Sequence, residues 1–115
     1  MKKLTLVLLT AVALSAVAAD TKVQGYLVDI ACASEEGQRA NFGIKHSKEC
    51  LQMPDCANSG YGLLTDDKKI IKFDAASNEK AKQFIADLTK KNDIKVNVTG
   101  TMNGERMTVS KIELQ

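Results

Sequence analysis

The residues best suited to chemistry gather in one segment at positions 46–62, HSKECLQMPDCANSGYG. This segment holds the only histidine and the only proline of the chain, together with two of its three cysteines. Its soft and borderline metal donors follow the spacing H-x3-C-x2-M-x2-C, which places them at His46, Cys50, Met53 and Cys56. Imidazole, thiolate and thioether together suit copper(I), while two cysteines and a histidine suit zinc or one side of a haem. The first hypothesis is therefore a site for copper, zinc or haem at these four residues.

Such a site needs an element that brings the donors together. Residues 45–53 have the composition for about two turns of helix, and Pro54 would end that helix because its ring disfavours helical geometry at the preceding residue. In a helix of this kind His46, Cys50 and Met53 would share one face, since they are four and three residues apart.

The three cysteines also allow a structural interpretation. In an oxidising compartment, cysteines of exported proteins form disulfides more often than they bind metals. A disulfide would brace the segment by joining Cys50 to Cys56, or Cys32 to one of them. Met53 would then fill a gap in the core, and His46 would be a surface or capping residue. The odd thiol would be buried, bound to a metal, or paired with a second chain in a disulfide-linked dimer.

A thiol–disulfide or redox protein that uses Cys50 and Cys56 is the competing functional class. It would need an accessible, stabilised thiolate, and Lys45 and Lys48 stand near Cys50 in the sequence. The C-x-x-C motif of such proteins is absent, and a single histidine without a G-x-S-x-G motif offers little basis for a hydrolase. Acidic residues such as Asp29 lack the spacing of an EF-hand calcium loop.

The N-terminal segment predicts export. Lys2 and Lys3 precede an apolar run that ends in small residues up to Ala19, the pattern of a secretory signal peptide over residues 1–19. The run is shorter than the about 20 residues that span a membrane, so we expect a periplasmic or secreted protein without membrane association after cleavage. Residues 20–115 carry equal numbers of basic and acidic side chains, which removes the electrostatic basis for binding nucleic acid.

Residues 20–115 predict a single domain of mainly β structure with one helix. A strand rich in β-branched and aromatic residues is expected over 22–30, followed by a cysteine-rich insert over 31–60. Asn103–Gly104 predicts a hairpin turn between the last two strands. The remaining expected elements are strands at 61–65 and 69–73, a helix at 78–91, and strands at 94–102 and 106–114.

This order of elements predicts a fold class. A strand, an insert, two strands, a helix and two strands is the order of a five-stranded OB-like Greek-key barrel. An open antiparallel α+β sheet with the helix on one face is the alternative.

Several motifs together resemble a group of small exported bacterial proteins of uncharacterised function. These motifs are GYLVDIAC, H-x3-C-L-x-M-P-x-C-x2-SGYG and V-x-V-T-G before the last hairpin, and the likeness covers nearly all of the chain after residue 19. The resemblance implies an exported location and implies no catalytic residue. In element order the chain is also similar to periplasmic OB-fold domains, which commonly bind ligands or partners.

These observations predict an exported, non-enzymatic binding or interaction module. Its cysteine-rich insert would be braced by a disulfide, with a soft metal or haem as the sharper hypothesis, and its partner would be an unidentified protein or small ligand. The redox protein that uses Cys50 and Cys56 remains the alternative.

Overall fold

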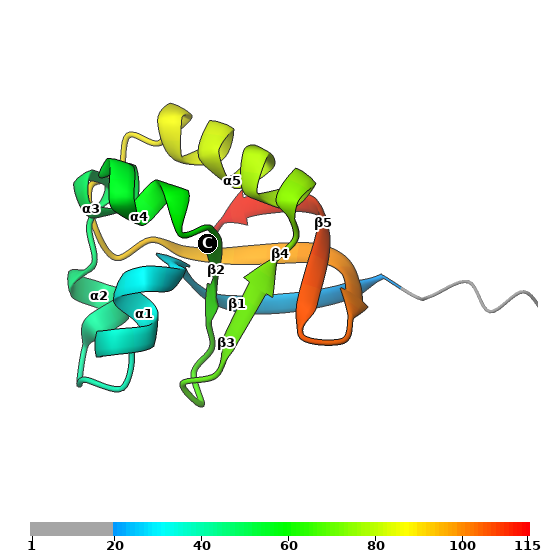
Figure 1. Cartoon of the computed structure of the whole chain (residues 1–115), viewed down its shortest axis with the longest axis horizontal. Coiled ribbons are helices and arrows are strands. Elements are labelled where there is room, and N and C mark those ends of the chain that lie inside the picture. Colours follow the sequence, from blue (N-terminus) through cyan, green and yellow to red (C-terminus); the bar gives the residue numbers. More distant parts are fainter. Residues whose placement is uncertain (1–19) are drawn as a thin grey trace, which may run out of the picture.

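The computed structural model describes residues 20–115, and the predicted signal peptide at residues 1–19 lies outside the described residues. The described chain is a mixed α/β structure in which five strands form a ring-like sheet, with one main helix and several short helical segments (Figure 1). The strands are β1 (Thr21–Asp29), β2 (Tyr61–Leu64), β3 (Ile70–Phe73), β4 (Lys95–Asn103) and β5 (Arg106–Leu114). The helices are α1 (Ile30–Glu36), α2 (Phe42–Lys45), α3 (Lys48–Gln52), α4 (Pro54–Asn58) and α5 (Ala75–Asp87). None of these described helices is long and apolar enough to cross a membrane.

The strands follow the order β1-β2-β3-β5-β4 around the ring, and β4 pairs with β1 to close it. Neighbouring strands are antiparallel except β3 and β5, which run parallel and pair at Lys72–Arg106 and Phe73–Met107. The predicted five strands and one main helix are confirmed. The predicted alternative of an open antiparallel sheet is wrong, because each described strand has two hydrogen-bonded neighbours and one pair is parallel.

An apolar core fills the ring because inward and outward positions alternate along its strands. On β4, Val96 and Val98 are buried while the residues beside them are partly exposed. The main helix α5 covers this core (Figure 1) through Ala81 and Ile85, which are also buried. All five strands contribute to the same buried cluster, with Leu27, Leu63, Phe73, Val96 and Met107 among its members.

Helix α5 begins and ends earlier than the predicted range of 78–91. The carboxylate of Asp74 accepts a hydrogen bond from the backbone N–H of Ser77 at 3.0 Å, so it caps a helix that begins at Ala75. The helix ends at Asp87, and Leu88 already has extended geometry.

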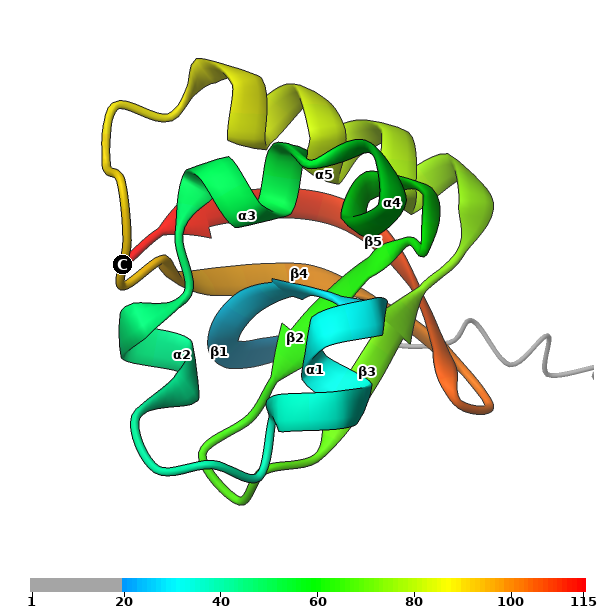
Figure 2. The ribbon, with the colours of Figure 1, turned by 60° about the vertical axis from the view of Figure 1, so that its left-hand side comes forward.

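The insert between β1 and β2 forms the four short helices α1 to α4, which gather along one side of the ring (Figure 2). Glycine at position 43 lets α2 lie directly against β1, because a Cβ atom there would be only 2.3 Å from the ring of Tyr26. The beginning of α1 is tied to the end of α4, since the backbone N–H of Ala31 donates to Oγ of Ser59 at 3.0 Å. The insert is therefore held at both of its ends.

The single helix predicted over residues 45–53 is wrong, because the chain is extended at His46 and a separate helix begins at Lys48. The hydroxyl of Ser47 accepts a hydrogen bond from the backbone N–H of Cys50 at 3.1 Å, so Ser47 starts a new helix instead of continuing the previous one. Pro54 ends α3 and also opens α4, where its missing N–H is not needed. His46 consequently does not share a helical face with Cys50 and Met53.

Candidate metal centre

Asp29 links β1 to the insert and has no exposed surface. As the last residue of β1 it caps α1, because its Oδ2 accepts a hydrogen bond from the backbone N–H of Cys32 at 3.0 Å. Its Oδ1 lies 2.7 Å from Nε2 of His46, whose N–H donates to the carboxylate. His46 is itself buried, with 7% of its surface exposed, so the predicted surface position of this histidine is wrong.

Two thiols lie beside this carboxylate. The Sγ atoms of Cys32 on α1 and Cys56 on α4 are 3.9 Å apart. One carboxylate oxygen of Asp29 and these two sulfur atoms all lie within 4.8 Å of one another, and Asp29 and Cys56 are buried. We refer to Asp29, Cys32 and Cys56 as the metal centre, because three donor atoms this close can hold one metal ion.

Burial and charge set the protonation of the centre. Burial would raise the pKa of Asp29, but hydrogen bonds from His46 and Cys32 outweigh it and hold that pKa below its usual value. Burial, and then contact with the Asp29 carboxylate, raises the pKa of Cys32 to about 12. Burial and the same negative charge also raise the pKa of Cys56. Without a cation both thiols keep their protons at neutral pH, and a bound metal would favour the thiolates.

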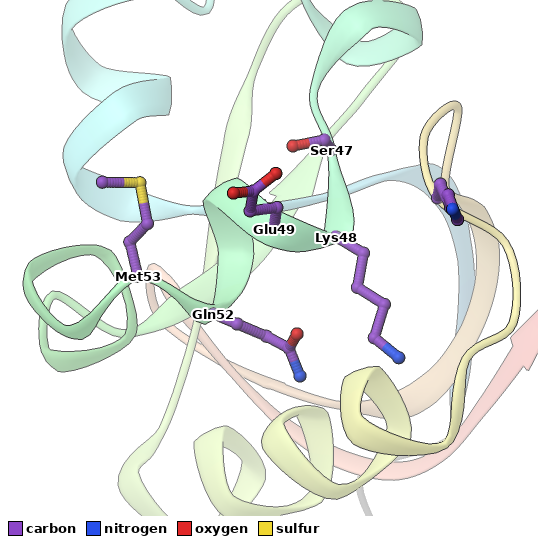
Figure 3. Close-up of a pocket in the computed structure, with 6 residues that line it drawn as sticks. Ser47, Lys48, Glu49, Gln52 and Met53 are labelled. Carbon is purple, nitrogen blue, oxygen red and sulfur yellow. The ribbon is translucent and has the colours of Figure 1, made fainter.

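The four residues predicted as metal donors do not form one site. Cys56 belongs to the metal centre, and His46 reaches it through the carboxylate of Asp29. Cys50 is partly buried and does not belong to the metal centre. Met53 is 52% exposed, so its predicted place in the core is wrong. It lines a separate cavity of about 500 Å³, where Lys48 and Gln52 of α3 point toward α5 (Figure 3).

The cysteines of the described chain are free thiols, and the pair in contact is Cys32 and Cys56. The predicted disulfide therefore stays a prediction. Of the pairings that the sequence leaves open, the geometry favours Cys32–Cys56 because these two Sγ atoms are only 3.9 Å apart.

Asp29 and its role were missed by reasoning from the sequence. Its signal is the spacing D-x-x-C at the end of a strand, in which the carboxylate caps the first helical turn and so approaches Cys32, three residues later. The partner His46 is 17 positions away, and no local pattern indicates that contact.

Comparison with known proteins provides no further guide, because no family model, no curated protein and no solved structure matches this chain.

Proposed function

We propose that this protein is an exported metal-binding module that holds one Zn²⁺ ion at Asp29, Cys32 and Cys56. The observation that carries the proposal is the 3.9 Å separation of the two Sγ atoms. Two sulfur ligands of one tetrahedral zinc ion lie about 3.8 Å apart, because each Zn–S bond is about 2.3 Å long. The two thiols therefore already have the spacing of a zinc-bound pair.

The donor chemistry favours zinc over the other predicted metals. A carboxylate with two thiolates is a borderline ligand set that occurs with Zn²⁺, whereas copper(I) prefers sulfur and nitrogen without a carboxylate. Haem iron takes one or two axial ligands, not three donors from the protein. With three protein ligands, a fourth zinc position would be open to water or to an outside ligand.

His46 would support the centre without binding the ion. Its Nε2–H donates to Oδ1 of Asp29, which fixes the orientation of the carboxylate. The backbone N–H of Cys32 holds the other oxygen. Each carboxylate oxygen has two lone pairs, so Asp29 can accept both hydrogen bonds and still bind a cation.

Zinc affinity of the reduced protein tests the proposal, measured by competition with a chromophoric chelator and by native mass spectrometry. Cys32→Ser and Cys56→Ser should weaken binding by more than the about 10–100-fold that loss of a supporting contact costs. Cys50→Ser and Met53→Ala are the matched controls and should keep the affinity. Unchanged binding in Cys32→Ser, or loss of binding in Met53→Ala, would contradict the proposal.

The contact between Cys32 and Cys56 also favours a second candidate function, a thiol–disulfide pair. This version of the redox alternative uses Cys32 in place of Cys50, because the 3.9 Å contact brings Cys32 next to Cys56. The raised pKa values of both thiols oppose it, since the thiolate is the reactive form. Rapid alkylation of either thiol at neutral pH in the metal-free protein would favour the redox function.

For the fold, we infer an OB-like Greek-key barrel. The strand order β1-β2-β3-β5-β4, the parallel contact of β3 with β5 and the helix between β3 and β4 support this assignment. The predicted signal peptide supports a periplasmic or secreted location.

A further inference from the structure

A second cavity lies beside the metal centre and contains none of its three ligands. Its volume is about 320 Å³, and its walls come from the end of α1, the following loop, α2 and α3. The lining residues that matter here are Glu36, Arg39, Phe42, Lys45, His46 and Cys50. We call it the Cys50 cavity, and its volume is in the range of sites that bind small molecules.

The cavity contains the thiol that the metal centre does not use. Cys32 and Cys56 contact each other, so Cys50 is the odd thiol among the described cysteines. It is partly buried in the cavity wall. That position is accessible to a small molecule, whereas a thiol that joins two protein chains needs a more exposed position.

His46 offers a free ring nitrogen in the same cavity. Its Nε2–H donates to Asp29, so Nδ1 is the ring nitrogen left for another partner. Within residues 20–115, Nδ1 has no hydrogen-bond partner, although the residue is only 7% exposed. The ring of Phe42 lies 4.8 Å from that of His46, between centroids, and adds an apolar wall. A ring nitrogen without a protein partner and a thiol therefore belong to residues that line the same open cavity.

The charges of the Cys50 cavity favour a negatively charged ligand. Arg39 and Lys45 both line it, and the single carboxylate, Glu36, lies 3.7 Å from Arg39. Lys45 has no acidic partner in the part of the chain that the structure describes. The positive charge of Lys45 is thus not neutralised by a neighbouring side chain and can attract a carboxylate group of a ligand.

We propose that the Cys50 cavity binds a small anionic disulfide and that Cys50 takes up half of it as a mixed disulfide. The sulfur of Cys50 attacks one sulfur of the ligand, a new S–S bond forms to Cys50, and the ligand's own S–S bond breaks. The thiol proton of Cys50 passes to solvent, and the released thiolate takes up a proton from solvent. Cys50 is oxidised and the departing thiol is reduced. The reaction uses none of the metal ligands, so it does not depend on the proposed zinc site.

Reduced, metal-free protein is treated with oxidised glutathione, which is anionic, or with cystamine, which is cationic. Peptide mass mapping then locates and times the adducts, in the folded protein and in urea. We expect one adduct, at Cys50. The ratio of the reaction rate with oxidised glutathione to that with cystamine should be about five times higher in the folded chain than in urea. An increase of this size corresponds to about one exposed ion pair. Arg39→Ala with Lys45→Ala should remove that preference, and Lys82→Ala on the exposed face of α5 should keep it.

A first adduct at Cys32 or Cys56 would overturn the proposal. A Cys32–Cys56 disulfide that forms without any adduct at Cys50 would also overturn it. The same holds if the folded chain and the chain in urea prefer the anionic reagent equally. Because the wild-type peptide map identifies the modified thiol directly, the result does not depend on the folding of a Cys50→Ser variant. Zinc binding is measured separately on the same preparation, so failure here leaves the metal centre in place.

Discussion

The ring of strands and the insert are stabilised in different ways. In the ring, one apolar cluster draws on every strand and on α5, and the insert adds only Leu51 of α3 to its buried members. Where the insert packs against β1 and β2, a smaller cluster of Val28, Ala33, Phe42 and Leu64 is supplemented by buried polar contacts centred on Asp29. Apolar packing responds little to protons or metals, while a buried carboxylate with thiol neighbours responds strongly to both. The fold thus separates a stable scaffold from a chemically responsive region.

The largest expected effect is in the ring. Phe73 is 1% exposed and lies in the main cluster, so Phe73→Ala should lower the free energy of unfolding by about 3–5 kcal/mol through lost burial and a new cavity. Urea denaturation followed by circular dichroism measures the change. A loss below about 1 kcal/mol would mean that the ring is not the main source of stability.

The next effect concerns the insert. Asp29→Ala removes the cap of α1 and leaves the buried N–H of His46 without an acceptor, so the free energy of unfolding should fall by about 2–3 kcal/mol. The measurement is made with a chelator present, so that zinc plays no part. Asp20→Ala is the control, since Asp20 is exposed, and it should change stability little.

Acid should weaken the insert through the same carboxylate. The pKa of Asp29 in the folded chain lies below its unfolded value of 3.8, so the folded state binds fewer protons in acid than the unfolded state. The stabilisation is therefore complete above pH 3.8 and is lost as the pH falls through the folded pKa. Unfolding free energies measured between neutral pH and strong acid should fall less steeply for Asp29→Ala than for the wild type, and parallel curves would contradict this role.

The smallest expected effect concerns a hydrogen bond that links the ring and the insert. The hydroxyl of Tyr61 on β2 donates to the backbone carbonyl of Leu51 on α3 at 2.7 Å, in a buried setting. Tyr61→Phe should cost about 0.5–1.5 kcal/mol of unfolding free energy. Hydrogen exchange should show the loss mainly in α3, with the amides of β4 unchanged, and equal loss in both would mean that the regions are not separable.

The predictability of the two regions differs in the same way. Alternation of apolar residues located β4 and β5, and the predicted hairpin between them is confirmed. Its two turn residues are Gly104, at a φ of 66°, and Glu105, because Asn103 still pairs with Arg106. The helical period over 78–91 located α5, although its bounds depend on the cap at Asp74. These elements are predictable because local pattern and burial agree.

The insert is less predictable because side chains compete with the backbone there. The hydroxyl of Ser47 starts a new helix within a segment that has an unbroken helical pattern. The metal centre depends on contacts between distant positions, such as Cys32 with Cys56 and Asp29 with His46. Cys56 was among the predicted donors because cysteine is a rare and informative residue type, whereas a single aspartate at the end of a strand is common.

The closure of the ring has a consequence for how quickly the chain folds. The first six residues of β1 pair with β4, from Thr21 opposite Gly100 to Tyr26 opposite Lys95. Contacts between residues so far apart in the sequence are slow to form, because a long loop must close before they are made. We therefore expect the ring to close only when the last third of the chain is available, because β4 lies there.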